Sequence, residues 1–341
     1  MPARALQWIA FLLALALLGC GCAGPSPAAK QTKDDYENIR LVMTCNGGEK
    51  SMDCMVAMKF IQMVEEESGG SIQVVLFHSE RLTGGDTRKG IEMLADGSVD
   101  LGCHGAGTLS LLDKRLAVAS IPWSYSSYQE ARHVIDTTGG AYYAKLLANQ
   151  GLVYLGSTHN GLRQLTNNKR PVRTLEDMAE LRVRVPGGGV HEEFIRAVGG
   201  VPVPLSWSEL PTAIAQGAVD GQDNGFITTN SARLQDLQKY MTIWNYCYEN
   251  FIFLANDEVF NSLEPKTQEL LRSKAREACD WGRDRMEQDE ARIKEDFRNA
   301  GVEITELTEE QLEPFREKTR PLVQRLKEAY GEEACTAFQI P

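Results

Sequence analysis

Two arginines alternate with apolar residues in the segment Leu181-Arg182-Val183-Arg184-Val185-Pro186. Alternation with a period of two is typical of a strand with one buried face, and Pro186 would end it because proline cannot donate to a sheet. Arg182 and Arg184 therefore leave the predicted strand on the same face. Arginine ends in a planar fork of N–H donors that matches a carboxylate. The segment thus predicts either a carboxylate-binding site or solvated arginines, and the strand alone does not decide between them.

Two other polar segments could add hydrogen bonds to the same ligand. They are Gly161-Leu162-Arg163-Gln164 and Val219-Asp220-Gly221-Gln222-Asp223-Asn224. We expect Arg163 to donate to the ligand or to a neighbouring polar group, or else to form a structural ion pair. The run Asp220-Gly221-Gln222 predicts a turn that brings Asn224 to the site, where its amide offers both a donor and an acceptor.

Three more candidates lie where strands end or helices begin. Asn46 follows an apolar run at 39–45, and His104 follows a run at 99–103. Ligands of open α/β sheets bind beyond the carboxyl ends of strands, so both side chains are expected near the site. Trp207 precedes a helical pattern, and an indole can pack on a ligand and donate its N–H. The alternatives are a turn asparagine, a structural histidine and a core tryptophan.

Alternating strand and helix patterns must position these residues. Short apolar or period-two runs predict strands, and apolar residues three or four apart predict helices. The predicted strands are 39–45, 71–77, 99–103, 152–157, 181–186, 201–204 and 251–255. The predicted helices are 51–68, 86–96, 189–198, 208–216 and 264–300. Strand, helix and parallel strand in succession indicate an open α/β sheet built by two crossovers.

The 341 residues of the chain exceed what one hydrophobic core usually serves, so two lobes are expected. We assign 36–160 with 250–289 to lobe I, and 161–249 with 290–341 to lobe II. The long helical pattern at 264–300 is suited to bracing both lobes. The predicted fold class is therefore α/β, with two lobes of open mixed sheets and flanking helices.

In order and spacing, these segments resemble the solute receptors of TRAP-type transporters, the DctP family. That family carries the patterns G-x-R-Q-x-T, L-K-x-R-V-P and V-D-G-Q-E-N in the same order. Between the last two lies a G-x-x-P-x-P-M-x-F/W-x-E block, to which Gly199 to Glu209 correspond. Further family positions are matched by Leu82 to Gly85, Leu94 to Asp100 and Ile121 to Trp123. The resemblance covers residues 38 to 330 and rests on the co-linear order of short motifs.

The resemblance implies a two-lobed, periplasmic-binding-protein-like fold that holds a small organic acid between its lobes. It implies Arg184 as the clamp on the carboxylate, with Arg163 and Asn224 beside it and with Trp207 and Asn46 near the solute. A TRAP permease with small and large membrane subunits would receive the solute and draw on an ion gradient. No ATPase, cofactor or catalytic activity is implied. The alternative is a lipoprotein sensor that presents its ligand state to a receptor kinase or chemoreceptor.

The N-terminal segment indicates where the protein works. Residues 8–18 are an unbroken apolar run, which is too short to span a bilayer and has the length of a secretory signal. The run ends in Leu17-Leu18-Gly19-Cys20, which resembles a bacterial lipobox. We therefore predict a signal peptide at 1–19, lipidation of Cys20 and a flexible tether at 20–35, which anchors an extracytoplasmic protein to a membrane. The alternatives are an ordinary cleaved signal peptide or lipidation of Cys22.

Charge and cysteine spacing exclude several other classes of protein. The net charge of −11 argues against a nucleic-acid partner. The sequence carries no nucleophile elbow, zinc-protease or phosphate-loop motif, so an enzyme is not expected. No cysteine pair has C-x-x-C spacing, which weakens a metal site. Buried thiols are the favoured state of most cysteines, and Cys279 with Cys335 is the best single candidate for a disulfide.

Overall fold

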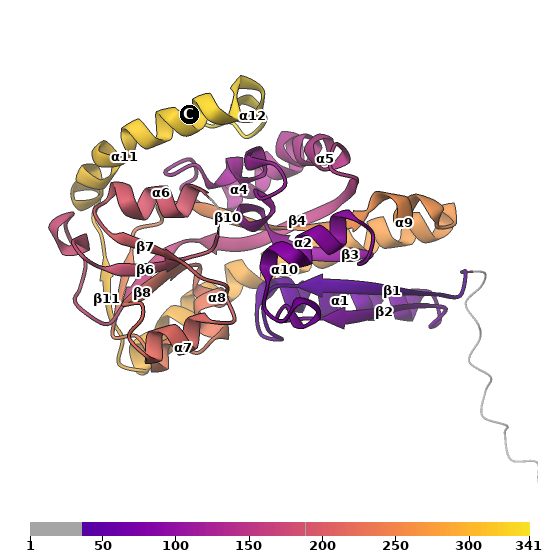
Figure 1. Ribbon diagram of the computed structural model, residues 1–341, viewed down its shortest axis with the longest axis horizontal. Helices are drawn as coiled ribbons and strands as arrows, with labels where there is room; N and C mark the ends of the chain where they lie inside the picture. The colour runs from indigo at the N-terminus through magenta and orange to yellow at the C-terminus, as the bar shows by residue number, and fades with distance from the viewer. Residues whose placement is uncertain (1–35, 188) are drawn as a thin grey trace, which may run out of the picture. The chain divides into compact units, whose positions relative to one another are not determined.

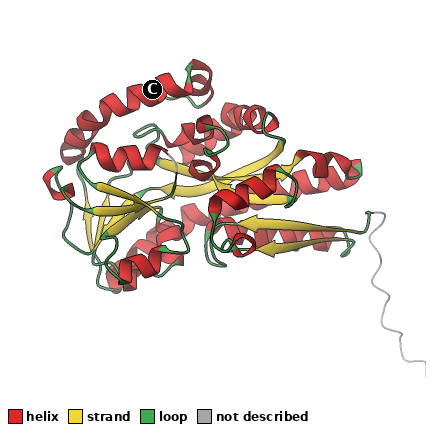
Figure 2. Cartoon of the chain, viewed as in Figure 1, coloured by secondary structure: helices red, strands yellow, loops and turns green. Residues whose placement is uncertain are grey.

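The computed structural model describes residues 36–187 and 189–341, which form two β-sheets with flanking helices (Figure 1, Figure 2). The predicted signal peptide, Cys20 and the tether at 20–35 lie outside the described residues. The first sheet has the strand order β2-β1-β3-β10-β4, and the second has the order β11-β9-β5-β8-β6-β7. The predicted α/β class with open mixed sheets is confirmed.

The first sheet is built by the two predicted crossovers. Both β2 and β3 pair with β1 in parallel, and α1 and α2 are the intervening helices. The rest of this sheet is antiparallel, because β10 lies between β3 and β4 and runs in the opposite direction to both. The elements are β1 (Ile39–Cys45), α1 (Met52–Glu67), β2 (Ile72–Phe77), α2 (Thr87–Ala95), β3 (Leu101–Gly105), β4 (Leu152–Leu162) and β10 (Tyr248–Asn256).

Strands β4 and β10 are longer than their apolar patterns predict. The prediction ends the first at residue 157 and begins the second at 251, because polar residues follow or precede. In the structure these polar residues are buried in pairs across the two strands. His159 Nδ1 lies 2.7 Å from the hydroxyl of Tyr248, and Asn160 donates to Glu249 at 2.9 Å. Because each buried polar group has a partner, the strands continue toward the second sheet.

The second sheet carries most of the sequence motifs. Strands β6 and β7 are parallel, β8 is parallel to β6, and β5 runs antiparallel to both β8 and β9. Helices α6, α7 and α8 connect or follow these strands. The elements are β5 (Gln164–Asn167), β6 (Arg182–Val185), α6 (Gly189–Ala197), β7 (Val201–Pro204), α7 (Leu210–Ala215), β8 (Gly221–Asn224), α8 (Phe226–Ser231), β9 (Tyr240–Ile243) and β11 (Glu303–Glu306).

The turn predicted at residues 220–222 is wrong, because Gly221 begins strand β8. A Cβ atom on Gly221 would lie 1.9 Å from the carbonyl oxygen of Thr166 on β5. Only glycine allows the two strands to approach this closely. Asn224 is the last residue of this strand and lies at the cavity described below, as expected. A strand, and not a turn, brings it there.

Two short chain segments connect the sheets and lie side by side, and the third connection runs from β10 through α9 and α10 to β11. Arg163 alone separates β4 from β5, while residues 244–247 separate β9 from β10. The backbone N–H of Arg163 donates to the carbonyl of Cys247 at 2.8 Å. The backbone of Arg163 is therefore held at the junction of the two sheets, and its side chain begins there.

A long helix spans elements of both sheets, as predicted. Helix α10 (Pro265–Asn299) packs on α1 and β4 of the first sheet and on α8 beside the second. After it, α11 packs on α6, whereas the end of α12 reaches the residues that flank the first sheet, where Phe338 packs on Tyr143 of α5 and its carbonyl accepts from the Tyr125 hydroxyl at 2.6 Å. The predicted lobe boundaries at 160 and 250 stay a prediction. The remaining helices are α3 (Ala106–Leu109), α4 (Tyr128–Val134), α5 (Gly140–Ala148), α9 (Asp257–Ser262), α11 (Glu309–Tyr330) and α12 (Glu332–Ala337).

The cysteines within residues 36–341 are free thiols, so the pairing of Cys279 with Cys335 is wrong. Cys279 is buried on α10, and its sulfur would lie 3.1 Å from a Cβ atom placed on Gly156 of β4. Cys335 is partly exposed on α12. Burial raises the pKa of Cys279 to about 12, so it stays a protonated, unreactive thiol.

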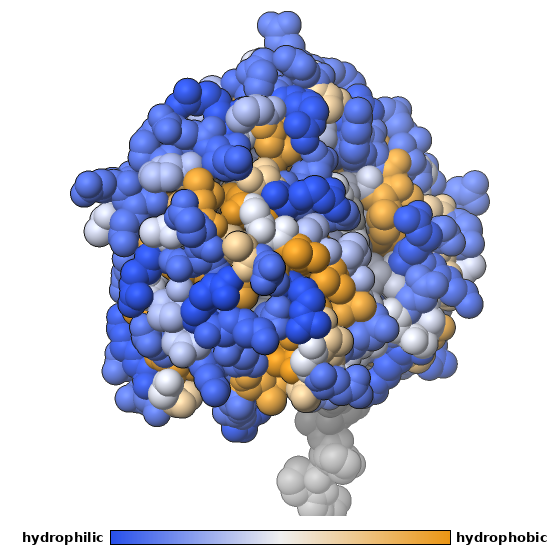
Figure 3. Space-filling model, turned by 60° about the vertical axis from the view of Figure 1, so that its left-hand side comes forward, coloured by the Kyte–Doolittle hydropathy of each residue, from blue (hydrophilic) through white to orange (hydrophobic). Residues whose placement is uncertain are grey.

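Hydrophilic side chains predominate on the face shown in Figure 3, and hydrophobic ones form small separate patches. Among the described residues, the helices are too short or too polar to cross a membrane. Most buried apolar side chains form one core that includes residues of both sheets, and a second, smaller cluster lies around α7.

Candidate functional site

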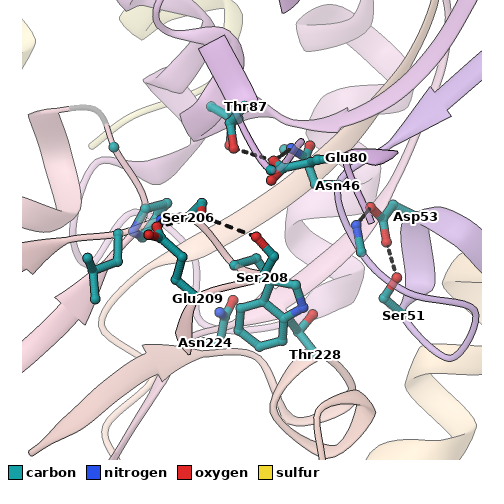
Figure 4. A pocket seen from close by; sticks show the side chains of 18 of the residues that line it. Asn46, Ser51, Asp53, Glu80, Thr87, Ser206, Ser208, Glu209, Asn224 and Thr228 are labelled. Atoms are coloured by element: carbon teal, nitrogen blue, oxygen red, sulfur yellow. Dashed lines mark hydrogen bonds between the residues drawn. The ribbon is translucent and has the colours of Figure 1, made fainter. Parts of the chain in front are cut away.

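A cavity of about 580 Å³ lies between residues of the first sheet and residues of the second. This volume is in the range of small-molecule sites. In Figure 4, Asn46, Glu80 and Thr87 lie on one side of it, and Ser206, Ser208 and Asn224 lie on the other. Other residues of the wall are Gly84, Gly85, Thr108, Arg163, Arg184, Leu205, Trp207, Thr228, Glu249 and Phe251. Five of the six predicted site residues therefore meet at one cavity, although their contact with a ligand stays a prediction.

Arg184 is a buried cation that forms no ion pair within 4.0 Å among the described residues. Strand β6 places it in the cavity wall, where it is 3% exposed. Its Nε donates to the carbonyl of Leu205 at 2.9 Å, and its guanidinium carbon lies 5.5 Å from the centre of the Trp207 ring. Among the described residues, nothing accepts a hydrogen bond from its two terminal nitrogens. Burial, with a contribution from nearby Arg163, lowers the pKa of Arg184 to about 10. An anion in the cavity would relieve this desolvated charge.

Arg182 lies two residues earlier and has a different role. Its guanidinium binds Asp220, with Nη2 at 2.8 Å from Oδ1 and Nε at 3.1 Å from Oδ2. The side chain of Arg182 is 42% exposed. Of the two arginines on this strand, the structure therefore leaves Arg184 available for a ligand.

Arg163 is held in a buried ion-pair network. Its Nε donates to Asp223 Oδ2 at 2.7 Å and its Nη2 donates to the Asp223 carbonyl at 2.6 Å, while Nη1 donates to Glu249. Burial alone would raise the pKa of Glu249, but Arg163 and His191 outweigh it and hold the pKa at about 2. Arg163 likewise holds the pKa of Asp223 below its usual value against the effect of burial. The structural ion pair considered from the sequence is thus present at the cavity wall.

Trp207 and Asn224 complete the second-sheet wall. Asn224 is buried at the end of β8, where it pairs with Gln164 of β5. Trp207 is half-buried and packs against the small apolar cluster of α7 while it also lines the cavity. Trp207 therefore does both things that the sequence analysis treated as alternatives, because it packs on the apolar cluster and also lines the cavity.

Asn46 lies on the opposite wall with His104 behind it. Asn46 Nδ2 donates to Glu80 at 2.6 Å, and His104 Nδ1 lies 2.6 Å from Asn46 Oδ1. His104 is 2% exposed and is not part of the wall, so the structure places it as a support of Asn46 rather than beside a ligand. Burial lowers the pKa of His104 to about 4, which keeps the ring neutral.

Four buried carboxylates at the site escaped the sequence analysis, namely Asp53, Glu80, Asp223 and Glu249. Glu80 follows β2 and precedes the Leu82–Gly85 motif, and no periodic pattern distinguishes it from a solvated loop residue. Asp223 and Glu249 are buried in strands, where an acidic residue is expected only when it is paired. The sequence offers one clue to both, because Arg163 was already considered as a member of a structural ion pair and would then need carboxylate partners. Within the described residues, no cluster of His, Cys, Asp or Glu could hold a metal ion.

A cavity between two open α/β sheets, lined by a buried arginine that forms no ion pair with the described residues, is the arrangement of a two-lobed solute-binding protein of the periplasmic type. Residues 46–329 match the model of the bacterial extracellular solute-binding proteins of family 7, named DctP, and the chain belongs to this family. The resemblance to TRAP solute receptors inferred from the motifs is thereby confirmed, and the protein works outside the cytoplasm.

Relatives and solved structures agree with this assignment. A solute-binding protein of Verminephrobacter eiseniae is 28% identical over 72% of this chain and 72% of its own length. A TRAP periplasmic solute-binding protein of a Polaromonas species, bound to D-erythronate, is 28% identical with a TM-score of 0.82, covering 88% of this chain and 98% of the other. One of Ralstonia eutropha, with bound (S)-2-acetolactate, is 25% identical with a TM-score of 0.85 and the same coverage.

Proposed function

We propose that this chain is the extracytoplasmic solute receptor of a TRAP-type importer, and that it binds a small organic acid through Arg184. The observation that carries the proposal is the buried guanidinium of Arg184, which lines the cavity with only its Nε engaged among the described residues. Its planar terminal nitrogens suit a carboxylate. The Polaromonas and Ralstonia relatives, which hold small carboxylic acids, support the same ligand chemistry.

The solute contacts both walls of the cavity in this proposal. Its carboxylate lies on Arg184 and within reach of Asn224, and Trp207 packs on its body. Asn46 and its neighbours contact it from the first-sheet side. Because a ligand that touches both walls binds the closed arrangement more tightly, it shifts the protein toward closure. The closed form then delivers the solute, chemically unchanged, to a permease of small and large membrane subunits. No observation favours the sensor alternative over transport.

A ligand screen on the purified protein tests this function. Mass spectrometry of the molecule that co-purifies should identify a small carboxylic acid, and acids of its class should raise the melting temperature. At a concentration of one hundred times Kd, a bound ligand stabilises the folded state by about 2.7 kcal/mol. If the co-purified ligand lacks a carboxylate, or if no organic acid shifts the melting temperature, the proposal is wrong.

We further propose that the protein is lipid-anchored through Cys20, a position outside the described residues. The motivation is the sequence Leu17-Leu18-Gly19-Cys20 after an apolar run. The Cys20→Ser variant should leave the membrane fraction for the soluble extracytoplasmic fraction while it keeps its solute affinity. Transport at low solute concentration should fall, since the tether sets the effective concentration near the permease.

Cell fractionation with a matched control decides the point about the anchor. The Cys22→Ser variant removes a neighbouring thiol and should remain in the membrane fraction. If Cys20→Ser stays at the membrane, the apolar run itself is retained as the anchor. If Cys22→Ser is released instead, the lipid is attached at that second cysteine.

A further inference from the structure

Glu80 is a buried carboxylate in the cavity wall opposite the second sheet. It is 7% exposed, and it belongs to the loop between β2 and α2. Both Ser79 and Glu80 adopt positive φ angles, 57° and 55°. Consecutive residues other than glycine are uncommon in this region of backbone space, and such strain gathers where a side chain must be held in a required place. The fold therefore positions the Glu80 carboxylate at the cavity against a backbone preference.

A directed chain of hydrogen bonds fixes one oxygen of this carboxylate. An ionised carboxylate only accepts, so the amide of Asn46 turns its Nδ2 to Glu80 Oε1, at 2.6 Å, and its Oδ1 to His104 Nδ1. His104 must then donate from Nδ1, and its Nε2 accepts from the hydroxyl of Thr44 at 3.1 Å. The Thr87 hydroxyl also donates to Glu80 Oε1. Glu80 Oε1 therefore has two donors from the protein.

The other oxygen, Glu80 Oε2, is buried and has no hydrogen-bond partner among the described residues. Leaving a buried acceptor unsatisfied is unfavourable, and more so for a charged group. Burial raises the pKa of the Glu80 carboxyl, while Thr87, Asn46 and the charge of Arg184 act in the opposite direction. Because Glu80 lines the cavity, a small shift of its side chain toward a donor on a bound solute would satisfy Oε2.

Glu80 and Arg184 are buried groups of opposite charge in the wall of the same cavity. Among the other charged residues of the wall, Asp86, Arg88 and Glu209 are exposed, and buried Asp53 accepts hydrogen bonds from the backbone N–H of Gly47 and the hydroxyl of Ser51. The charge of Arg163 is already matched by Asp223 and Glu249. In the described part of the chain, no ion pair within 4.0 Å joins Glu80 to Arg184, although each affects the pKa of the other. The cavity thus offers a cationic donor on the second-sheet wall and an anionic acceptor on the first-sheet wall.

We propose that Glu80 selects the end of the solute remote from its carboxylate, so that the receptor takes a monocarboxylate with a hydroxyl or ammonium donor there and rejects a dicarboxylate. This inference rests on the proposed function and specifies its solute class. A second carboxylate beside Glu80 would place like charges together in a desolvated site and would leave Oε2 unsatisfied. Such juxtaposition is strongly unfavourable at buried interfaces.

Matched acids that differ only at the remote end test the inference on the unmodified protein by calorimetry. The pairs are D-glycerate with tartronate, D-erythronate with meso-tartrate, and D-gluconate with D-glucarate. The series of 4-hydroxybutyrate, 4-aminobutyrate and succinate separates a hydroxyl from an ammonium donor. In the pair or series that fits the cavity, we expect the dicarboxylate to bind about tenfold or more weakly than its partner.

The Glu80→Gln variant assigns the preference to this residue. Glutamine retains an acceptor for Asn46 and Thr87, so the fold should persist, and its melting temperature reports whether it does. The preference for the monocarboxylate should shrink to within about threefold, because the like-charge term is lost. Glu92→Gln, the same change at an exposed position of α2 outside the cavity wall, should leave the preference unchanged.

The outcomes separate this inference from the proposed function. If a dicarboxylate binds as tightly as its monocarboxylate partner, or if Glu80→Gln keeps the full preference, Glu80 does not select the solute and the receptor function stands. If no acid of either kind binds, and none co-purifies with the protein, the proposed function itself fails.

Discussion

Replacing Arg184 with alanine is expected to weaken solute binding by about 2–5 kcal/mol, because it leaves the carboxylate of the solute desolvated and without a partner. The same change should not destabilise the empty protein strongly, since a buried cation without a counter-ion is removed. Calorimetry with the co-purified acid measures the first effect, and thermal unfolding without ligand measures the second. Weaker binding together with retained stability would distinguish a binding residue from a structural one.

Lysine at position 184 should also bind the solute poorly. A point charge on a flexible stem cannot match the planar fork, and it cannot keep the contact of Nε with Leu205 while it engages a carboxylate. Arg182→Lys is the matched control, because Arg182 lies on the same strand and is paired with Asp220 outside the cavity wall. It should leave solute affinity within about twofold of the parent. If Arg184→Lys binds equally well, the carboxylate clamp lies elsewhere.

The strand that carries Arg184 was predictable because it depends on local pattern, whereas the choice of Arg184 as the carboxylate clamp rested on the resemblance to the DctP family. The period-two alternation around Val183 and Val185 fixes the strand, and Pro186 fixes its end. A strand end in an open sheet faces the ligand site. The same rule placed Asn46 correctly after β1. His104, in contrast, lies inside strand β3 and outside the cavity wall, where it is hydrogen-bonded to Asn46.

The residues that pair across sheets were not predictable from local pattern. Asp223 and Glu249 are 26 residues apart in sequence, at opposite sides of the junction between the sheets, and both are held by Arg163. A single sequence contains no periodic signal for a contact of this kind. For the same reason the predicted end of β4 was too early and the predicted start of β10 was too late. A run of polar residues indicates a loop unless their partners are known.

Arg163→Ala is expected to lower the free energy of unfolding by about 3–5 kcal/mol, because it leaves Asp223 and Glu249 buried without a counter-ion. Solute affinity should fall as well, since these carboxylates and Arg163 form the junction beside Asn224 and Arg184. Chemical denaturation measures the first effect and calorimetry the second. A double-mutant cycle of Arg163 with Arg184 on solute affinity should be non-additive. Strict additivity would mean that the two arginines act independently.

The pH dependence of stability provides a separate test of the same network. In the folded state the pKa of Glu249 is about 2, below the value of about 4.3 for glutamate in an unfolded chain. As the pH falls, the unfolded state therefore binds the proton first. The network stabilises the fold fully above about pH 5, and this contribution is lost progressively as the pH falls from about 5 through about 2. Combining Arg163→Met with Asp223→Asn and Glu249→Gln removes all three charges and should flatten this part of the profile. An equally steep fall in that variant would assign the acid sensitivity to other carboxylates, and Arg163 would then have no measurable part in holding the two sheets together.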